Sequence, residues 1–282
     1  MNLKIFDDAK TFYERIKQNF SDKQMENDLM LGLAYLLIDD PNHYGSQPFL
    51  ASIEEDGKIF LCAFMTPPWN ILVHGIEECP DLSYKILIDY ILKERISIPG
   101  ANGRADISKK FMDIWCNKTQ NKSELHMESR LFILTEVNKI TNSSGHLVKA
   151  DMSHFRLLNE WAKQFHVEVR LDVEDDYIRK HVKYIIQSGN AFLWIDKEPV
   201  CMTFCERPHE NGISISYVFT PPKFRNKGYA LSCVATVSQR ILGSGFAYCS
   251  LFTDLTNPTS NSIYQKIGYR PACDYIHYNF KQ

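Results

Sequence analysis

Residues 218–230 read VFTPPKFRNKGYA, and this stretch guides the interpretation of the whole chain. Its apolar beginning predicts a strand, the basic segment around Gly228 predicts a tight turn, and the residues that follow predict a helix. The first N–H groups of a helix have no partner within it and lie at the positive end of its dipole, so they attract anions. Gly228 lets the backbone approach a ligand closely, while Arg225 and Lys227 add positive charge. The stretch therefore predicts a cradle for the phosphates of a nucleotide-type cofactor.

Two common phosphate-binding glycine motifs are absent from the chain: the P-loop GxxxxGK[ST] and the dinucleotide fingerprint GxGxxG. The stretch instead resembles the Arg/Gln-x-x-Gly-x-Gly/Ala loop that binds the acyl-CoA pyrophosphate in the GNAT superfamily of N-acyltransferases, matched by Arg225, Gly228 and Ala230. A second block, residues 257–269 (NPTSNSIYQKIGY), resembles that family's Asn-x-x-Ala/Ser-x-x-x-Tyr-x-x-x-Gly-Phe/Tyr helix. Two blocks in this order make the resemblance specific to the C-terminal half.

The predicted fold class is α/β with a mixed sheet, GNAT-like over roughly residues 146–282. Apolar runs at 191–195, 200–205 and 213–219 predict an antiparallel meander, and alternating elements follow it. These are a helix at 228–242, a strand at 247–253, a helix at 258–266 and a final strand at 274–280. Two helices, opened by Ser153 and near 175–187, precede the meander.

The N-terminal half shows a similar order of two helices, three strands and a helix, which fits a degenerate GNAT-like repeat. Residues 66–86 contain no Arg-x-x-Gly-x-Gly loop, so this half is not expected to bind CoA well and is expected to form a wall of the acceptor site. At 282 residues the chain has room for two domains. The expected domains are residues 1–140, of α/β type, and residues 141–282, the catalytic acetyltransferase domain.

The resemblance implies roles for particular residues. Tyr264 matches the family's general acid, since a phenol is able to protonate a departing thiolate. Asn257 matches the Asn that contacts the pantetheine arm, although it is equally suited to cap a helix before Pro258. The strand before the loop is expected to supply oxyanion and pantetheine contacts through its backbone N–H groups. The expected cofactor-binding residues are Tyr217, Val218, Phe219, Arg225, Asn226, Lys227, Gly228, Tyr229, Ala230, Asn257, Asn261 and Ser262.

The general base is not assigned by the sequence. Some family members carry a Glu in the strand that holds the acetyl group, but residues 213–219 contain no carboxylate. Glu206, Asp254 and His209 lie near predicted strand ends and remain candidates, directly or through water.

The amino-acid composition limits the binding partners and the cellular compartment that we expect. A formal net charge of −2 gives no electrostatic reason to expect nucleic acid or an anionic membrane as partner. Residues 1–8 lack the apolar core of a signal peptide, and no apolar run is long enough to span a bilayer, so a cytoplasmic protein is expected. The eight cysteines form no CxxC pair, which argues against a zinc site and fits buried thiols.

Two functions are therefore compared. The first is an N-acetyltransferase that moves the acetyl group of acetyl-CoA to a primary amine of a small molecule or peptide by direct attack. The alternative is a non-catalytic acyl-CoA-binding or regulatory module with the same fold, which the missing strand carboxylate favours and Tyr264 disfavours. Peptidyl transfer from aminoacyl-tRNA is disfavoured by the acidic charge balance. The sequence does not identify the acceptor or the oligomeric state.

Overall fold

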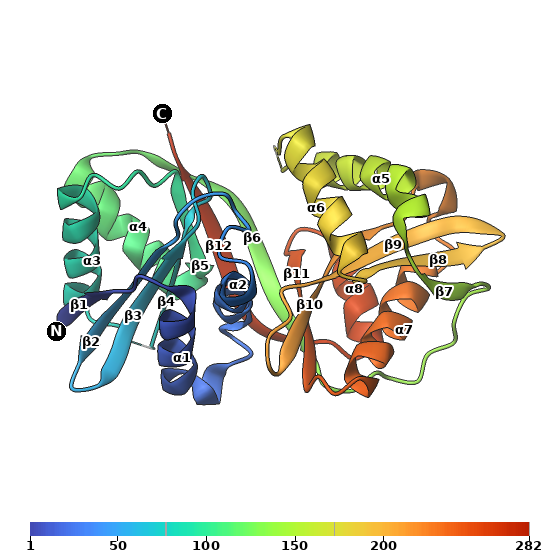
Figure 1. Cartoon of the computed structure of the whole chain (residues 1–282), viewed down its shortest axis with the longest axis horizontal. Helices are drawn as coiled ribbons and strands as arrows, with labels where there is room; N and C mark the ends of the chain where they lie inside the picture. The colour runs from blue at the N-terminus through green and yellow to red at the C-terminus, as the bar shows by residue number, and fades with distance from the viewer. Residues whose placement is uncertain (77, 172, 282) are drawn as a thin grey trace. The chain divides into compact units, whose positions relative to one another are not determined.

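We describe the protein from a computed structural model, which defines residues 1–76, 78–171 and 173–281. By its internal contacts the chain divides into two compact units (Figure 1). Unit 1 comprises Met1–Leu131, Thr253–Thr256 and Pro271–Gln282, and unit 2 comprises Phe132–Phe252 and Asn257–Arg270. Each unit combines helices with a mixed sheet, as the sequence predicts.

Unit 1 contains the strand order β1-β2-β3-β4-β5-β12-β6. Its strands are β1 (Asn2–Ile5), β2 (Phe49–Glu55), β3 (Lys58–Met65), β4 (Ile71–Gly75), β5 (Gly100–Arg104), β6 (Ser123–Leu134) and β12 (Arg270–Phe280). Its helices are α1 (Ala9–Asn19), α2 (Asp28–Asp39), α3 (Asp81–Lys93) and α4 (Ala105–Thr119). The strands β1 to β4 pair antiparallel, β4 and β5 run parallel, and β5 is antiparallel to β12. The last strand of the chain thus completes the sheet that the first residues begin (Figure 1, red).

Unit 2 contains the strand order β6-β11-β10-β9-β8-β7, with β6 passing from one unit into the other at Leu131. Its further strands are β7 (His146–Lys149), β8 (Ala191–Asp196), β9 (Glu198–Glu206), β10 (Gly212–Phe219) and β11 (Tyr248–Asp254). Its helices are α5 (Phe155–Glu168), α6 (Asp175–Gln187), α7 (Tyr229–Gly243) and α8 (Pro258–Ile267). The meander β8-β9-β10 is antiparallel as predicted, and β10 runs parallel to β11.

The two faces of the unit 2 sheet carry different helix pairs. Alternate side chains of β10, Ile213 and Ile215, pack with α7 and α8 in one apolar core. On the other face Phe204, Met202 and Phe219 pack with α5 and α6. Figure 1 shows these two helices beside the strands β8 and β9. Because successive strand residues point to opposite faces, Ser214 and Ser216 share the α5/α6 face. The sheet therefore separates a face covered by α7 and α8 from a face covered by α5 and α6.

The sequence patterns missed β1, β5 and α4. The β5 sequence GANGR has no apolar alternation, because its glycines serve close backbone packing. A Cβ at Gly100 would lie 2.0 Å from the carbonyl oxygen of Tyr278, and one at Gly103 would lie 2.1 Å from that of Val73. Ser153 does not begin α5 as predicted, since Asp151 caps a short 3-10 turn, Met152–His154, that leads into it.

Candidate functional site

An opening between two strands lies at the centre of unit 2. Among the described residues, the parallel ladder between β10 and β11 covers Gly212–Ser214 against Tyr248–Ser250, although β10 continues to Phe219 and β11 to Asp254. Beyond Ser214 the edge of β10 that faces β11 therefore leaves the regular ladder. Backbone groups on such an edge are free to form sheet-like hydrogen bonds with an extended ligand.

A β-bulge marks the same segment of β10. Its register against β9 shifts between Ser216 and Phe219. Within the bulge Tyr217 adopts a φ of +48°, a conformation that is unusual for an aromatic residue. Such strain is often found at functional sites, where the surrounding structure maintains it. The predicted residues Tyr217, Val218 and Phe219 thus form an irregular strand end.

The loop after β10 has the shape of an anion cradle. A 3-10 turn, Pro222–Phe224, leads to Asn226 and Gly228, which have φ angles of +63° and +77°. Residues 225–228 are exposed, and the N-cap position of α7 is Gly228, whose hydrogen atom cannot cap the helix as a side chain would. Left-handed residues beside a helix start turn successive N–H groups toward one point. The first N–H groups of α7, beginning at Tyr229 and Ala230, complete this cradle.

The segment before β7 supports the loop from behind. The hydroxyl of Ser143 donates to the carbonyl oxygen of Lys227 at 2.7 Å, and the backbone N–H of Ser143 donates to Ser232 Oγ at 2.7 Å. A Cβ at Gly228 would lie only 2.7 Å from Ser143 Oγ. Gly228 is therefore required by its left-handed φ and by this support, in addition to any approach by a ligand.

The two basic side chains of the loop are placed differently. Arg225 donates through Nε to the carbonyl of Thr220 at 2.9 Å, forms an ion pair with Glu168 on α5, and lies 6.0 Å from the centre of the Phe219 ring. Its guanidinium thus braces the strand end against α5. Exposed ion pairs contribute little energy, so a phosphate is able to compete for this group. Lys227 is exposed at the tip of the cradle.

Tyr264 lies inside the core formed by α7, α8 and the sheet. Its ring meets the Tyr269 ring edge-on, with centres 5.9 Å apart. Burial, with a smaller contribution from Cys201, raises the pKa of the Tyr264 phenol well above its ordinary value. The phenol is therefore protonated at neutral pH, as a proton donor must be.

The other predicted residues of this helix lie near its start. The Asn257 side chain accepts from the backbone N–H of Ser260 at 3.1 Å, which confirms its role as N-cap of α8. Asn261 is partly buried one turn later, and Ser262 is exposed. A contact of these residues with a pantetheine arm remains a prediction.

The three candidate bases occupy different settings. Asp254 accepts the N–H and the hydroxyl of Thr256, each at 2.7 Å, as in a local turn. His209 is buried, and its Nε2 lies 3.1 Å from the hydroxyl of Tyr248. Glu206 is also buried, at the end of β9, with its Oε1 2.6 Å from Nε2 of His181 on α6.

Sequence reasoning did not identify His181, Arg207 or His166 as part of this region. His181 follows Tyr177 by four residues on α6, and their rings are parallel with centres 6.0 Å apart. His166 on α5 has its Nε2 2.7 Å from the Tyr217 hydroxyl. The helical spacing of His181 from Tyr177 and Ile185 was the available signal, because it puts this histidine on the buried face.

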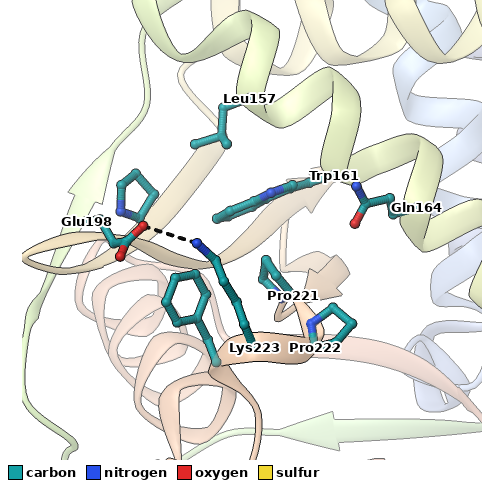
Figure 2. Close-up of a pocket in the computed structure, with 9 residues that line it drawn as sticks. Leu157, Trp161, Gln164, Glu198, Pro221, Pro222 and Lys223 are labelled. Atoms are coloured by element: carbon teal, nitrogen blue, oxygen red, sulfur yellow. Dashed lines mark hydrogen bonds and ion pairs between the residues drawn. The ribbon is translucent and has the colours of Figure 1, made fainter.

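A pocket of about 460 Å³ opens beside the loop, between α5, the start of β9 and residues 221–224 (Figure 2). The Trp161 ring lines it, and Lys223 extends along it to place Nζ 3.4 Å from Oε2 of Glu198. The side of the loop that faces α5 is therefore bordered by a pocket with a partly apolar lining.

Among the described residues, no group of three or more His, Cys, Asp or Glu side chains is arranged to hold a metal ion. Within the same ranges, no helix combines the length and apolar character that a membrane-spanning segment requires.

Comparisons with known proteins bear on this architecture. A family model described as FR47-like protein matches residues 200–277, which include β10, the loop, α7 and α8. An acetyltransferase of the GNAT family from Colwellia psychrerythraea superimposes with a TM-score of 0.62 at 11% identity, with 100% of each chain covered. The GCN5-related N-acetyltransferase from Sphaerobacter thermophilus gives a TM-score of 0.66 at 11% identity, covering 99% of this chain and 95% of its own. The chain has the GNAT acetyltransferase fold.

A tandem GNAT protein from the clavulanic acid biosynthesis pathway also matches, with a TM-score of 0.57, 7% identity and 98% of both chains covered. These matches confirm the resemblance to the GNAT superfamily and the predicted fold class, and the tandem protein fits the interpretation of two GNAT-like halves. No curated protein matches the sequence. The GNAT fold supports acyl transfer in general and an acyl-CoA co-substrate, whereas the identities are too low to define a particular activity.

Proposed function

We propose that the protein is an N-acetyltransferase that moves the acetyl group of acetyl-CoA to a primary amine of a small molecule or peptide. The observation that carries this proposal is the opening between β10 and β11, which begins after Ser214 and leads directly into the Asn226–Gly228 cradle. One extended ligand with an amide-rich arm and a pyrophosphate end matches both features. Acetyl-CoA has this construction.

The chain's residues divide the chemistry between them. The first N–H groups of α7, with Lys227 and Arg225, would bind the phosphates. Backbone N–H groups of the bulged segment 216–219 would pair with the pantetheine amides and stabilise the charge that develops on the thioester oxygen. Tyr264, kept protonated by burial, would give its proton to the departing thiolate. Asn257, Asn261 and Ser262 stand at the start of α8 as further contacts with the arm.

The attack is direct in this proposal, without an acyl-enzyme. Cys201 and Cys233, which share an apolar cluster with Tyr229 at the start of α7, are both completely buried. A hydrogen bond with Cys201, together with burial, raises the pKa of the Cys233 thiol well above its ordinary value, which disfavours a thiolate nucleophile. The cysteines form no disulfide among the described residues, and we place the protein in the cytoplasm, where thiols stay reduced.

The catalytic domain in this proposal is the C-terminal one, residues 141–282, and residues 1–140 form a GNAT-like domain that does not bind CoA. In unit 1 the connection from β4 to α3 contains no glycine, and Pro80 stands at the N-cap of α3. The cradle of unit 2 therefore has no counterpart in sequence there.

The test is release of CoA thiol from acetyl-CoA with a panel of polyamines, aminoglycosides, amino acids and lysine peptides, with the rate without acceptor as control. Acceleration by one class is the expected result, and it would also define the acceptor. The competing function is a non-catalytic acyl-CoA-binding module. A raised melting temperature with acetyl-CoA, combined with no acceleration across the panel, would favour that alternative. No shift with acetyl-CoA would contradict both.

A further inference from the structure

A buried carboxylate lies next to the bulge of β10. Glu206 is 6% exposed, and both of its oxygens have cationic or titratable partners: Oε1 lies 2.6 Å from His181 Nε2, and Oε2 lies 3.2 Å from Arg207 NH1. The His181 contact, Arg207 and the Ser216 hydroxyl outweigh the cost of burial and lower the pKa of Glu206 to about 2. Glu206 is therefore ionised at every pH at which the protein would work.

The strand register places this carboxylate at the opening. Glu206 pairs across the strands with Ser214, the last residue of β10 that is in register with β11. Arg207, the ion-pair partner of Glu206, also donates through NH2 to the Ser214 hydroxyl at 3.0 Å. Arg207 thus links the Glu206 carboxylate to the residue after which β10 and β11 diverge. The helix that follows the cradle, α7, covers the opposite face of the sheet. An acceptor would thus reach the thioester from the α5/α6 face, on which Ser216 and His181 lie.

His181 is held in one orientation. Its ring lies parallel to that of Tyr177 on its own helix, with an interplanar angle of 4°, and its centre is 5.3 Å from that of Tyr217 on β10. Its side chain keeps 13% exposure, so it is the part of the pair nearest to solvent. Its Nε2 lies 2.6 Å from the charged carboxylate of Glu206, which favours the neutral tautomer with its proton on Nε2 and its lone pair on Nδ1.

Building on the function proposed above, we propose that His181 is the general base that deprotonates the acceptor amine, and that Glu206 is the positioning residue that fixes its tautomer and stabilises its protonated form. Histidine held by a carboxylate is a recurrent arrangement for proton abstraction. The pair comes from β9 and α6, outside the β10 segment in which a carboxylate was sought.

The proton and bond changes balance as follows. His181 Nδ1 takes one proton from the bound ammonium, and the amine lone pair then forms the C–N bond while the C–S bond breaks. The thiolate takes the proton of Tyr264. The nitrogen's second proton returns to the phenolate through solvent, and His181 releases the first proton to water. The net change is ammonium plus thioester to amide, thiol and one proton.

Several titratable or charged groups lie close to His181 and must be considered when the pH dependence of the rate is interpreted. They are Tyr177 on α6, His166 on α5, Tyr217 on β10, and Glu206 and Arg207 at the end of β9. Burial, the nearby His181 and Glu206 affect His166, with a net lowering of its pKa. Burial raises the pKa of Tyr177 to about 12 and that of Tyr217 well above its ordinary value. Both tyrosines are therefore protonated at neutral pH.

The decisive variant is His181→Gln, whose amide retains a donor for Glu206 but has no basicity. We expect kcat/KM at pH 7 to fall about 100-fold, within the usual range for loss of a general base, with unchanged acetyl-CoA affinity. The wild-type profile should level off at high pH. The variant should instead rise about tenfold per pH unit, because it depends on free amine, whose pKa is near 10. His146→Gln, at an exposed position of β7, is the matched control.

A second variant separates chemistry from folding. His181→Ala should recover activity when imidazole is added, which a defect of packing would not do. If His181→Gln keeps the wild-type rate and pH profile, the assignment is wrong while the acetyltransferase function stands. If the wild type binds acetyl-CoA but acetylates no amine, the proposed function itself is wrong, and the base assignment is overturned with it.

Discussion

The two units repeat one order of elements but differ where the fourth strand of each ends. In unit 2, β10 leads through the exposed loop Arg225–Gly228 into α7, and its partner β11 pairs with only the first part of it. In unit 1, β4 ends at Gly75, and the described part of the next connection carries Glu78 and Pro80 with no basic residue. The cores of both units are well packed, so the fold does not depend on the cradle. The comparison teaches that the structural repeat and the chemistry are separable.

The helices that follow the fifth strand show the same contrast. Counted from their N-cap residues, Arg104 and Asn257, Phe111 of α4 occupies the place that Tyr264 occupies in α8. Both side chains are buried in the core of their unit. Tyr264→Phe therefore gives unit 2 the side chain of unit 1 at this place, with the packing preserved.

We expect this change to have the largest effect on the rate. Turnover of acetyl-CoA should fall by about 10²- to 10³-fold, because the thiolate loses its proton donor, whereas acetyl-CoA affinity should change little. Steady-state kinetics combined with calorimetric titration would measure both. Tyr269→Phe is the control, since its hydroxyl binds Ser238 Oγ at 2.8 Å and takes no part in the proposed chemistry. Equal rates for Tyr264→Phe and the wild type would assign Tyr264 to packing alone.

The charge of the loop is the next difference to remove. Lys227→Glu places a carboxylate in the cradle of unit 2, just as Glu78 places one in the corresponding connection of unit 1. Because Lys227 is exposed, the change should not disturb the packing of the core. The dissociation constant of acetyl-CoA should rise on the order of 100-fold, because a charge-assisted contact is replaced by repulsion. The increase should be smaller at high salt.

Lys109→Glu, on the exposed face of α4, is the control for the change in net charge. An unchanged dissociation constant for Lys227→Glu would contradict the phosphate cradle. Substitution of Gly228 is a less direct test, because its φ of +77° and the 2.7 Å approach of a Cβ to Ser143 Oγ would disturb the loop itself.

Much of unit 2 was predictable because local chemistry defines it. Gly189 follows the C-cap of α6, and the capping geometry of Asn257 follows from its place before Pro258. The β5 strand escaped prediction because contacts distant in sequence determine its glycines. Gly100 lies against the backbone of Tyr278 and Gly103 against that of Val73, so neither position has room for a side chain. The Glu206–His181 pair escaped for the same reason. It joins a strand end to a helix across 25 residues of chain, and only the tertiary packing brings the two together.

One histidine in each unit gives the last contrast. Nε2 of His181 forms an ion-pair contact with Glu206, whereas neither an ion pair nor a hydrogen bond is found for the ring nitrogens of His74, on β4, among the described residues. His74 is 2% exposed, and its ring meets Phe20 edge-on at 5.0 Å. Burial, together with Arg104, lowers the pKa of His74 to about 3. His74 is therefore neutral in the folded protein, without the carboxylate that would make it a base.

His74→Leu should consequently stabilise the protein and leave acetyl transfer intact. The unfolded chain binds a proton at this residue below pH 6.5, whereas the folded protein does so only near pH 3, so His74 removes stability as the pH falls between these values. From pH 7 to pH 5 that loss is about 2 kcal/mol, and the variant should not show it. Melting temperatures at both pH values, with exposed His146→Leu as control, would measure the difference. If His74→Leu destabilises the protein equally at both pH values, or abolishes transfer, then unit 1 uses this histidine, and chemistry is not confined to unit 2.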